Sequence, residues 1–208
     1  MRRLNSLKVM REILRISFIG AVVTIVACTG TAPVKDEAPV VKQMAQQGLD
    51  SLSDSQNLRY QKALSLMKQG KYANAQKLLV ELRKKAPGLL ELLLNLSIVQ
   101  YQQQDFKNAN HTLAQALAIN DASEKANNIA GLVAIELGDF KKAETYFKKA
   151  LSKDNNYAMA NYNLALLYDV YLQDVSQAVA HYSQYLLVEK NDETTQAWVD
   201  HLKSSMNK

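Results

Sequence analysis

Gln69-Gly70-Lys71-Tyr72-Ala73-Asn74-Ala75 is the stretch that decides the fold, because similar stretches recur along the chain. The copies at 103–109 and 137–143 each follow the previous copy after 34 residues, and a fourth, imperfect copy at 172–178 comes one residue late. Self-similarity at a fixed period of this length indicates a repeat architecture, in which each unit is one supersecondary element.

Apolar residues between the copies recur at helical spacing, in segments separated by short breaks. The pattern predicts two helices per unit, at 58–69 and 72–85, 89–103 and 106–119, 122–137 and 140–151, and 157–172 and 175–188. Pro87 ends the second helix, because proline lacks an amide hydrogen and disfavours the helical conformation for the residue before it. A last helix is expected at 193–206, with Asp192 as its N-cap.

A period of 34 residues, with two helices per unit and a glycine between them, resembles the tetratricopeptide repeat. The resemblance covers residues 56–190 in four repeats that start at Gln56, Leu90, Glu124 and Ala158. It implies an all-α, right-handed solenoid of about four helix–turn–helix repeats, with a C-terminal capping helix within 191–208. Small residues stand where the paired helices of this family touch: Ala63, Ser97, Gly131 and Ala165 in the first helices, and Ala75, Ala109, Ala143 and Ala178 in the second.

The sequence departs from the family pattern at two kinds of position. The turn glycine is present as Gly70 and Gly138, but glutamine replaces it at Gln104 and Gln173. These glutamines must adopt a conformation open to a side chain or bear strain. The extra residue in the fourth repeat, near 169–174, predicts a longer or bulged turn.

Two large residues in the fourth repeat, Tyr182 and Tyr185, stand where earlier repeats have smaller ones. They predict looser packing inside this repeat, with the gap filled by the last helix and its Trp198.

The charge balance bears on the class of partner. The formal net charge is +5, but residues 1–27 account for +4 of it, and the remainder has 20 basic against 19 acidic residues. A nearly neutral remainder has no electrostatic footprint for phosphate binding, so no nucleic acid is expected as a partner.

Residues 1–27 are predicted to be an export signal peptide, with a basic start and an apolar run at 16–26 that is too short to cross a bilayer. The stretch Ile25-Val26-Ala27-Cys28 resembles the lipobox of bacterial lipoproteins. The resemblance implies cleavage before Cys28, a diacylglycerol on its sulfur, and an acyl chain such as palmitate on the new amino terminus.

Thr29, rather than aspartate, follows this cysteine. By the sorting habit of the lipoprotein family, that residue favours the periplasmic face of the outer membrane, with the inner membrane as the alternative. Residues 28–55 are polar and contain Pro33 and Pro39, which predicts a flexible tether.

The inventory of reactive residues predicts no catalytic residue, no metal site and no cofactor. The three histidines, His111, His181 and His201, lie in different repeats or in the cap and share no ligand spacing. No thiol remains once Cys28 is lipidated, and no strand precedes the glycines, as a phosphate-binding loop requires.

The tetratricopeptide resemblance places a partner in the concave groove, which the first helix of each repeat lines. Exposed apolar rows usually mark partner sites. An alternative stays open for the aliphatic residues, which would instead pack against the neighbouring repeat. The predicted groove residues are Tyr60, Leu64, Met67, Leu94, Asn95, Ile98, Tyr101, Asn128, Leu132, Ile135, Tyr162, Asn163 and Leu166.

Together the two resemblances imply a membrane-anchored protein–protein interaction scaffold that assists the assembly or operation of a bacterial envelope complex. They imply a protein or peptide ligand in the groove and no small-molecule substrate. The chain is loosely similar to the tetratricopeptide lipoproteins of pilus biogenesis. The alternatives are an adaptor for an envelope protease or for a secretion or energy-transducing system, and a cell-wall enzyme.

Overall fold

The computed structural model describes residues 48–206, and residues 54–206 form nine α-helices and one π-helical segment. The first two pairs are α3 (Asp54–Lys68) with α4 (Tyr72–Lys85), and α5 (Leu90–Gln102) with α6 (Phe106–Ile119). The next two are α7 (Glu124–Glu136) with α8 (Phe140–Ala150), and α9 (Ala158–Leu166), which continues as η1 (Leu167–Leu172), with α10 (Val175–Val188). The last helix is α11 (Glu193–Met206).

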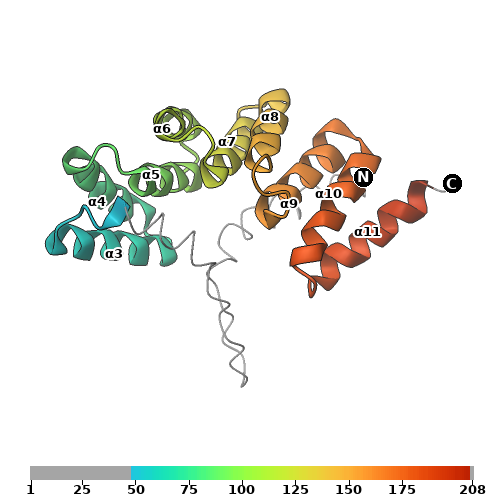
Figure 1. The fold of residues 1–208 in the computed structure, drawn as a ribbon, viewed down its shortest axis with the longest axis horizontal. Coiled ribbons are helices and arrows are strands. Elements are labelled where there is room, and N and C mark those ends of the chain that lie inside the picture. The colour runs from blue at the N-terminus through green and yellow to red at the C-terminus, as the bar shows by residue number, and fades with distance from the viewer. Residues whose placement is uncertain (1–47, 207–208) are drawn as a thin grey trace, which may run out of the picture.

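The helix pairs follow one another along an arch, with α3 at one end and α11 at the other (Figure 1). No strand occurs between residues 48 and 206. The prediction of an all-α solenoid of four helix pairs and a last helix is therefore confirmed. The predicted signal peptide, the lipidation site at Cys28 and most of the predicted tether lie outside the described residues. Leu52 packs into the N-terminal core and Ser53 caps α3, so the packed residues begin a few positions before Gln56.

Aspartates begin three of the four second helices. Asp105, Asp139 and Asp174 each accept a hydrogen bond from an amide in the first turn of α6, α8 and α10. Lys71 occupies the same position before α4 and makes no side-chain cap. The first repeat therefore lacks a stabilising contact that the other three possess.

The turns within the repeats share one backbone conformation. The residue before each of these cap positions has a positive φ: 71° at Gly70, 62° at Gln104, 78° at Gly138 and 56° at Gln173. This left-handed region suits glycine and is costly for residues that carry a side chain. Glutamine thus adopts the glycine conformation at two turns, which are strained.

The extra residue of the fourth repeat is absorbed by the helix before the turn. In the first three repeats the cap residue donates its amide to a carbonyl five residues back, as in Asp139 to Ala134 at 2.9 Å. Asp174 donates to Tyr168, six residues back, also at 2.9 Å. The expected irregularity is present, but it is a π-helical widening of Leu167–Leu172 and not a longer turn.

Two apolar clusters form the core. One joins α3 and α4 to one face of α5 through Leu92, Leu96 and Val99. The other begins on the opposite face of α5 with Leu93 and Leu94 and extends to α11. Helix α5 therefore belongs to both clusters.

Candidate partner-binding face

The first helices of the repeats lie side by side along the inner side of the arch. Figure 1 shows α3, α5, α7 and α9 along its lower side, with α6 and α8 above them. Helix α7 packs against both α5 and α9. The helices that carry the predicted groove residues are thus neighbours along this side.

Most of these predicted residues have little area left to offer a partner. Buried side chains are those of Tyr60, Leu94, Tyr101, Asn128, Leu132, Ile135, Asn163 and Leu166. Half-buried side chains are those of Leu64, Met67, Asn95, Ile98 and Tyr162. The accessible part of the predicted groove therefore consists of four apolar side chains and one amide, on α3, α5 and α9.

Hydrogen bonds between neighbouring repeats engage four of the predicted residues. The Asn95 Nδ2 donates to the hydroxyl of Tyr60 at 2.8 Å, and the Asn163 Nδ2 donates to the Asn128 Oδ1 at 3.0 Å. In each pair the partners are 35 residues apart. A separation of 35 residues is one repeat of 34 plus one position. Each pair therefore joins the first helices of two successive repeats.

The corresponding pair between α5 and α7 is apolar, because Leu94 and Ile129 stand at those positions and both are buried. Hydrogen-bonded pairs thus link α3 to α5 and α7 to α9, whereas the equivalent positions of α5 and α7 carry buried apolar residues. A further contact links the same two helices, since the Tyr101 hydroxyl donates to the Glu136 Oε1 at 3.4 Å. These contacts fix the first helices relative to one another before any partner binds.

Burial changes the ionisation of groups at the N-terminal end of the face. Burial and the nearby charge of Glu91 raise the pKa of Tyr60 to about 12, so its hydroxyl stays protonated at neutral pH. Burial also raises the pKa of Glu91 above its usual value. The protonated Tyr60 hydroxyl is thus held as the hydrogen-bond acceptor of Asn95.

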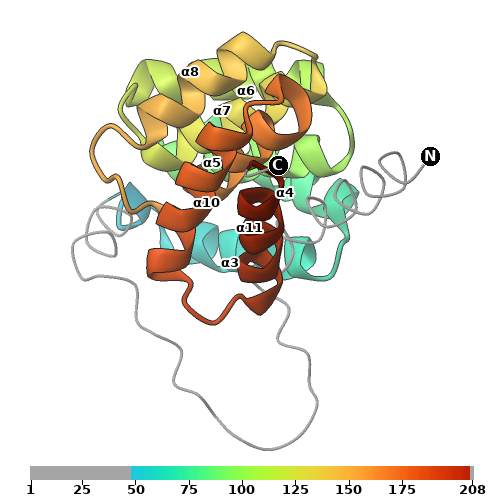
Figure 2. The ribbon, with the colours of Figure 1, turned by 90° about the vertical axis from the view of Figure 1, so that its right-hand side faces the viewer.

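An aromatic cluster closes the C-terminal end of the face. The Tyr162 ring lies 5.7 Å from that of Tyr182 and 5.0 Å from that of Tyr185, between ring centroids. The Trp198 indole on α11 donates to the Asp169 Oδ2 at 2.8 Å. Figure 2 shows α11 at this end of the molecule. Tyr182 and Trp198 thus both reach Asp169, because the Tyr182 hydroxyl also donates to the Asp169 Oδ2 at 3.5 Å.

Two aspartates are built into this cluster with opposite pKa shifts. Burial raises the pKa of Asp169, although Trp198 and Tyr182 stabilise its charge by hydrogen bonds. Burial alone would also raise the pKa of Asp192, but hydrogen bonds from Thr195 and Tyr185 lower it overall. Asp192 accepts from the Thr195 amide at 3.0 Å, which confirms it as the N-cap of α11.

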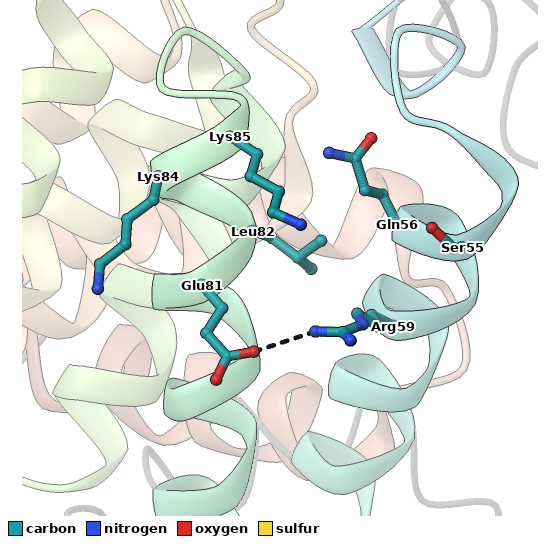
Figure 3. A pocket seen from close by; sticks show the side chains of 7 residues that line it. All are labelled: Ser55, Gln56, Arg59, Glu81, Leu82, Lys84 and Lys85. Atoms are coloured by element: carbon teal, nitrogen blue, oxygen red, sulfur yellow. Dashed lines mark hydrogen bonds and ion pairs between the residues drawn. The ribbon is translucent and has the colours of Figure 1, made fainter.

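A second surface feature, which sequence reasoning missed, lies between α3 and α4. A hollow of about 310 Å³ lies between these two helices, and Figure 3 shows the side chains that line it. Its polar lining includes Arg59, Lys84, Lys85 and Glu81, with Leu82 between the helices. Counting charges repeat by repeat, instead of over the whole chain, would have pointed to it.

The described part of the chain has neither a metal-binding cluster nor a membrane-spanning helix. Between residues 48 and 206, no group of three His, Cys, Asp or Glu side chains is placed to hold a metal ion. In the same range no helix is long and apolar enough to cross a membrane.

Family comparisons identify the repeats. Residues 66–130 and residues 124–157 each match a tetratricopeptide-repeat family model. No match was found among curated proteins.

Several solved structures share the fold. The MamA 41-end structure from Desulfovibrio magneticus RS-1 has a TM-score of 0.63 and 16% identity, covering 76% of this chain and 88% of that one. TTC0263, a thermophilic TPR protein in Thermus thermophilus, has a TM-score of 0.63 and 20% identity, covering 77% and 87%. Pseudomonas aeruginosa pilF has a TM-score of 0.67 and 17% identity, covering 79% and 71%. At these identities the likeness shows the fold alone.

Proposed function

Because the chain carries tetratricopeptide repeats, which indicate a protein–protein interaction scaffold, we propose that it holds a protein or peptide segment along the inner face of α3, α5, α7 and α9. The observation that carries this proposal is the row of half-buried apolar side chains on that face: Leu64, Met67, Ile98 and Tyr162. Side chains of this kind gain free energy when a partner covers them. The hydrogen-bonded pairs Tyr60–Asn95 and Asn128–Asn163 fix the first helices relative to one another, which reduces the entropy that binding must cost.

The proposal includes attachment to a bacterial envelope membrane through Cys28. Its support is the lipobox-like stretch at 25–28, which follows a basic and then apolar segment. Several acyl chains hold a protein on a bilayer far more firmly than one chain does. In this arrangement the scaffold assists the assembly or operation of an envelope complex, on the periplasmic face of the outer membrane.

Capture of envelope partners by crosslinking tests the inner face. Met67→Ala with Ile98→Ala removes apolar area from the row while leaving the buried pairs in place, and should reduce capture of the main crosslinked partner at least about tenfold. The matched control is Ile119→Ala with Leu187→Ala, two aliphatics that are 47% and 60% exposed on the second helices α6 and α10. If both double variants capture the partner equally well, the partner does not bind on the inner face.

Metabolic labelling with palmitate tests the anchor separately. The wild-type chain should incorporate label and Cys28→Ser should not. Equal labelling of the two would remove lipidation at Cys28 from the proposal without affecting the inner face.

A further inference from the structure

The charges of the described residues are unevenly divided between the first repeat and the rest of the arch. Asp54–Lys85, which covers α3 and α4, has eight lysines and arginines against two carboxylates, a net of +6. Residues 89–206 have nine against fourteen, a net of −5. The near-neutral net charge of the chain after residue 27 therefore hides a strongly basic first repeat. Charge summed over all repeats did not predict it.

The lysines of this basic repeat are not neutralised by their neighbours. Arg59 pairs with Glu81 at 3.2 Å. Lys77, Lys84 and Lys85 are exposed, and none of them forms a salt bridge with a residue in the range 48–206. Their charge is available to an external partner.

The third repeat provides the contrast. Helix α8 also ends in two lysines, but Lys148 pairs with Glu144 at 2.6 Å and Lys149 with Asp121 at 3.0 Å. A pair of lysines in the last turn of a second helix is therefore not enough to create a basic surface. The first repeat is basic because it lacks carboxylates that pair with its lysines as Glu144 and Asp121 do in the third.

The free lysines share one continuous surface. The hollow lined by Arg59, Lys84 and Lys85 meets a second, more open hollow of about 500 Å³ that is lined by Lys77 and Lys84. Glu81 borders both. Figure 3 shows the Arg59 and Lys85 side chains reaching the first hollow from opposite helices.

An exposed aliphatic residue stands next to Arg59 in α3. Leu58 precedes Arg59 and is 74% exposed, the highest value among the large hydrophobic residues that are exposed between residues 48 and 206. Lys62 lies one turn further along α3 and is also exposed. Cations beside an exposed aliphatic residue suit the interface of a bilayer, where phosphates and acyl chains are both within reach.

We propose that this basic surface of α3 and α4 docks on a bilayer that contains anionic phospholipids. The inference rests on the proposed anchor for one point: Cys28 would be attached to the bilayer only 26 positions before α3 begins. The first repeat is then the folded part that follows the anchor most closely along the chain. A lipid anchor and a polybasic surface reinforce each other, and each lysine close to an anionic surface strengthens binding about fivefold.

Vesicle sedimentation tests the docking surface without the anchor. The protein is residues 28–208 with Cys28→Ser, which keeps both apolar clusters, since their members lie between Leu52 and Leu202. It should bind vesicles of phosphatidylglycerol and phosphatidylethanolamine, ignore vesicles of phosphatidylcholine alone, and dissociate when salt is raised to about 0.5 M.

Two matched triple variants locate the surface. Lys77→Gln with Lys84→Gln and Lys85→Gln should weaken vesicle binding about 100-fold. Lys141→Gln with Lys148→Gln and Lys149→Gln removes the same charge from the third repeat and should leave binding within about twofold, because two of these lysines are already paired. Circular dichroism checks the fold, and Lys84→Gln with Lys85→Gln, expected to lose about 25-fold, replaces the first triple variant if that variant unfolds.

Equal binding to anionic and neutral vesicles, or equal loss in both triple variants, would overturn the docking surface. Binding to poly-glutamate without binding to vesicles would also overturn it, in favour of an acidic polypeptide partner. If palmitate labelling fails while vesicle binding is intact, the proposed anchor is wrong and the proposed docking surface is supported. If the chain is labelled but does not bind vesicles, only the proposed docking surface is wrong.

Discussion

A Cβ atom built on Gly131 would lie 2.4 Å from the Cε1 atom of Phe147. Gly131 is in the first helix of the third repeat and Phe147 is fully buried in the second. The corresponding pairs of the first two repeats are Ala63 with Leu79 and Ser97 with Leu113, and all four side chains are buried. In the third repeat the Phe147 ring fills the space that the methyl group of an alanine would take at position 131. The small residue and the large residue of this pair therefore compensate each other in size.

Gly131→Ala should therefore destabilise the fold by about 1–3 kcal/mol, because the added methyl group overpacks the contact with Phe147. Chemical denaturation measures the difference. The control is Gly88→Ala, since a Cβ atom at Gly88 would meet no atom within 4 Å. Wild-type stability of Gly131→Ala would show that the two helices separate easily at this point.

Gln104→Gly should stabilise the fold by about 1 kcal/mol, because φ at this turn is 62° and glycine adopts that conformation without the steric cost of a Cβ atom. The neighbouring Gln103→Gly is the control, since φ there is −81° and glycine gains nothing. Thermal unfolding compares them. A lower melting temperature for Gln104→Gly than for wild type would contradict strain at this turn.

Lys71→Asp should add the N-cap that α4 lacks and stabilise the fold by about 1 kcal/mol. The backbone is suited to it, since Lys71 has φ −83° and ψ 58° while the capping Asp105 has −88° and 66°. Lys71→Ala separates the cap from the loss of a cation. If the alanine and aspartate variants unfold at the same denaturant concentration, the cap contributes nothing.

Stability should depend on pH through His181. Burial, and then the charge of Lys148, lower its pKa below the usual value of 6.5. Below that pH the unfolded chain takes up a proton more readily than the folded chain does. The His181 contribution is therefore fully present above pH 6.5 and is lost as the pH falls towards the folded pKa.

His181→Gln should flatten this part of the stability curve, measured by denaturation between about pH 5 and 8. The variant is also expected to be less stable overall, because the His181 ring stacks on Tyr168. Only the difference in slope tests the titration. Parallel curves for wild type and variant would assign the acid sensitivity to other groups.

The sequence predicted the architecture because the period and the small contact residues are local signals. Ala75, Ala109, Ala143 and Ala178 recur where helices touch, and all four are fully buried. The same approach could not show that Asn95 and Asn163 already bond to the preceding repeat, since asparagine at these positions equally suits a bound peptide. Their use became clear only from the packing of neighbouring first helices.

Two further features escaped sequence reasoning for different reasons. The inserted residue was recognised near 169–174, but a helix can absorb an insertion by widening, and the sequence does not say which turn widens. The basic first repeat was missed because charge was summed over the chain, and carboxylates of later repeats cancel it.

Helix α5 gives its two faces to different apolar clusters, and this has a consequence for how the protein opens. The α3–α4 hairpin depends on one cluster, to which α5 contributes Leu92, Leu96 and Val99, whereas the later repeats are held by the other. Local opening can then release the hairpin while the remaining repeats stay folded. We expect the backbone amides of the α3–α4 hairpin to exchange with solvent as one group, earlier than those of α7. The repeat that carries the proposed membrane-docking surface is then also the first to unfold locally.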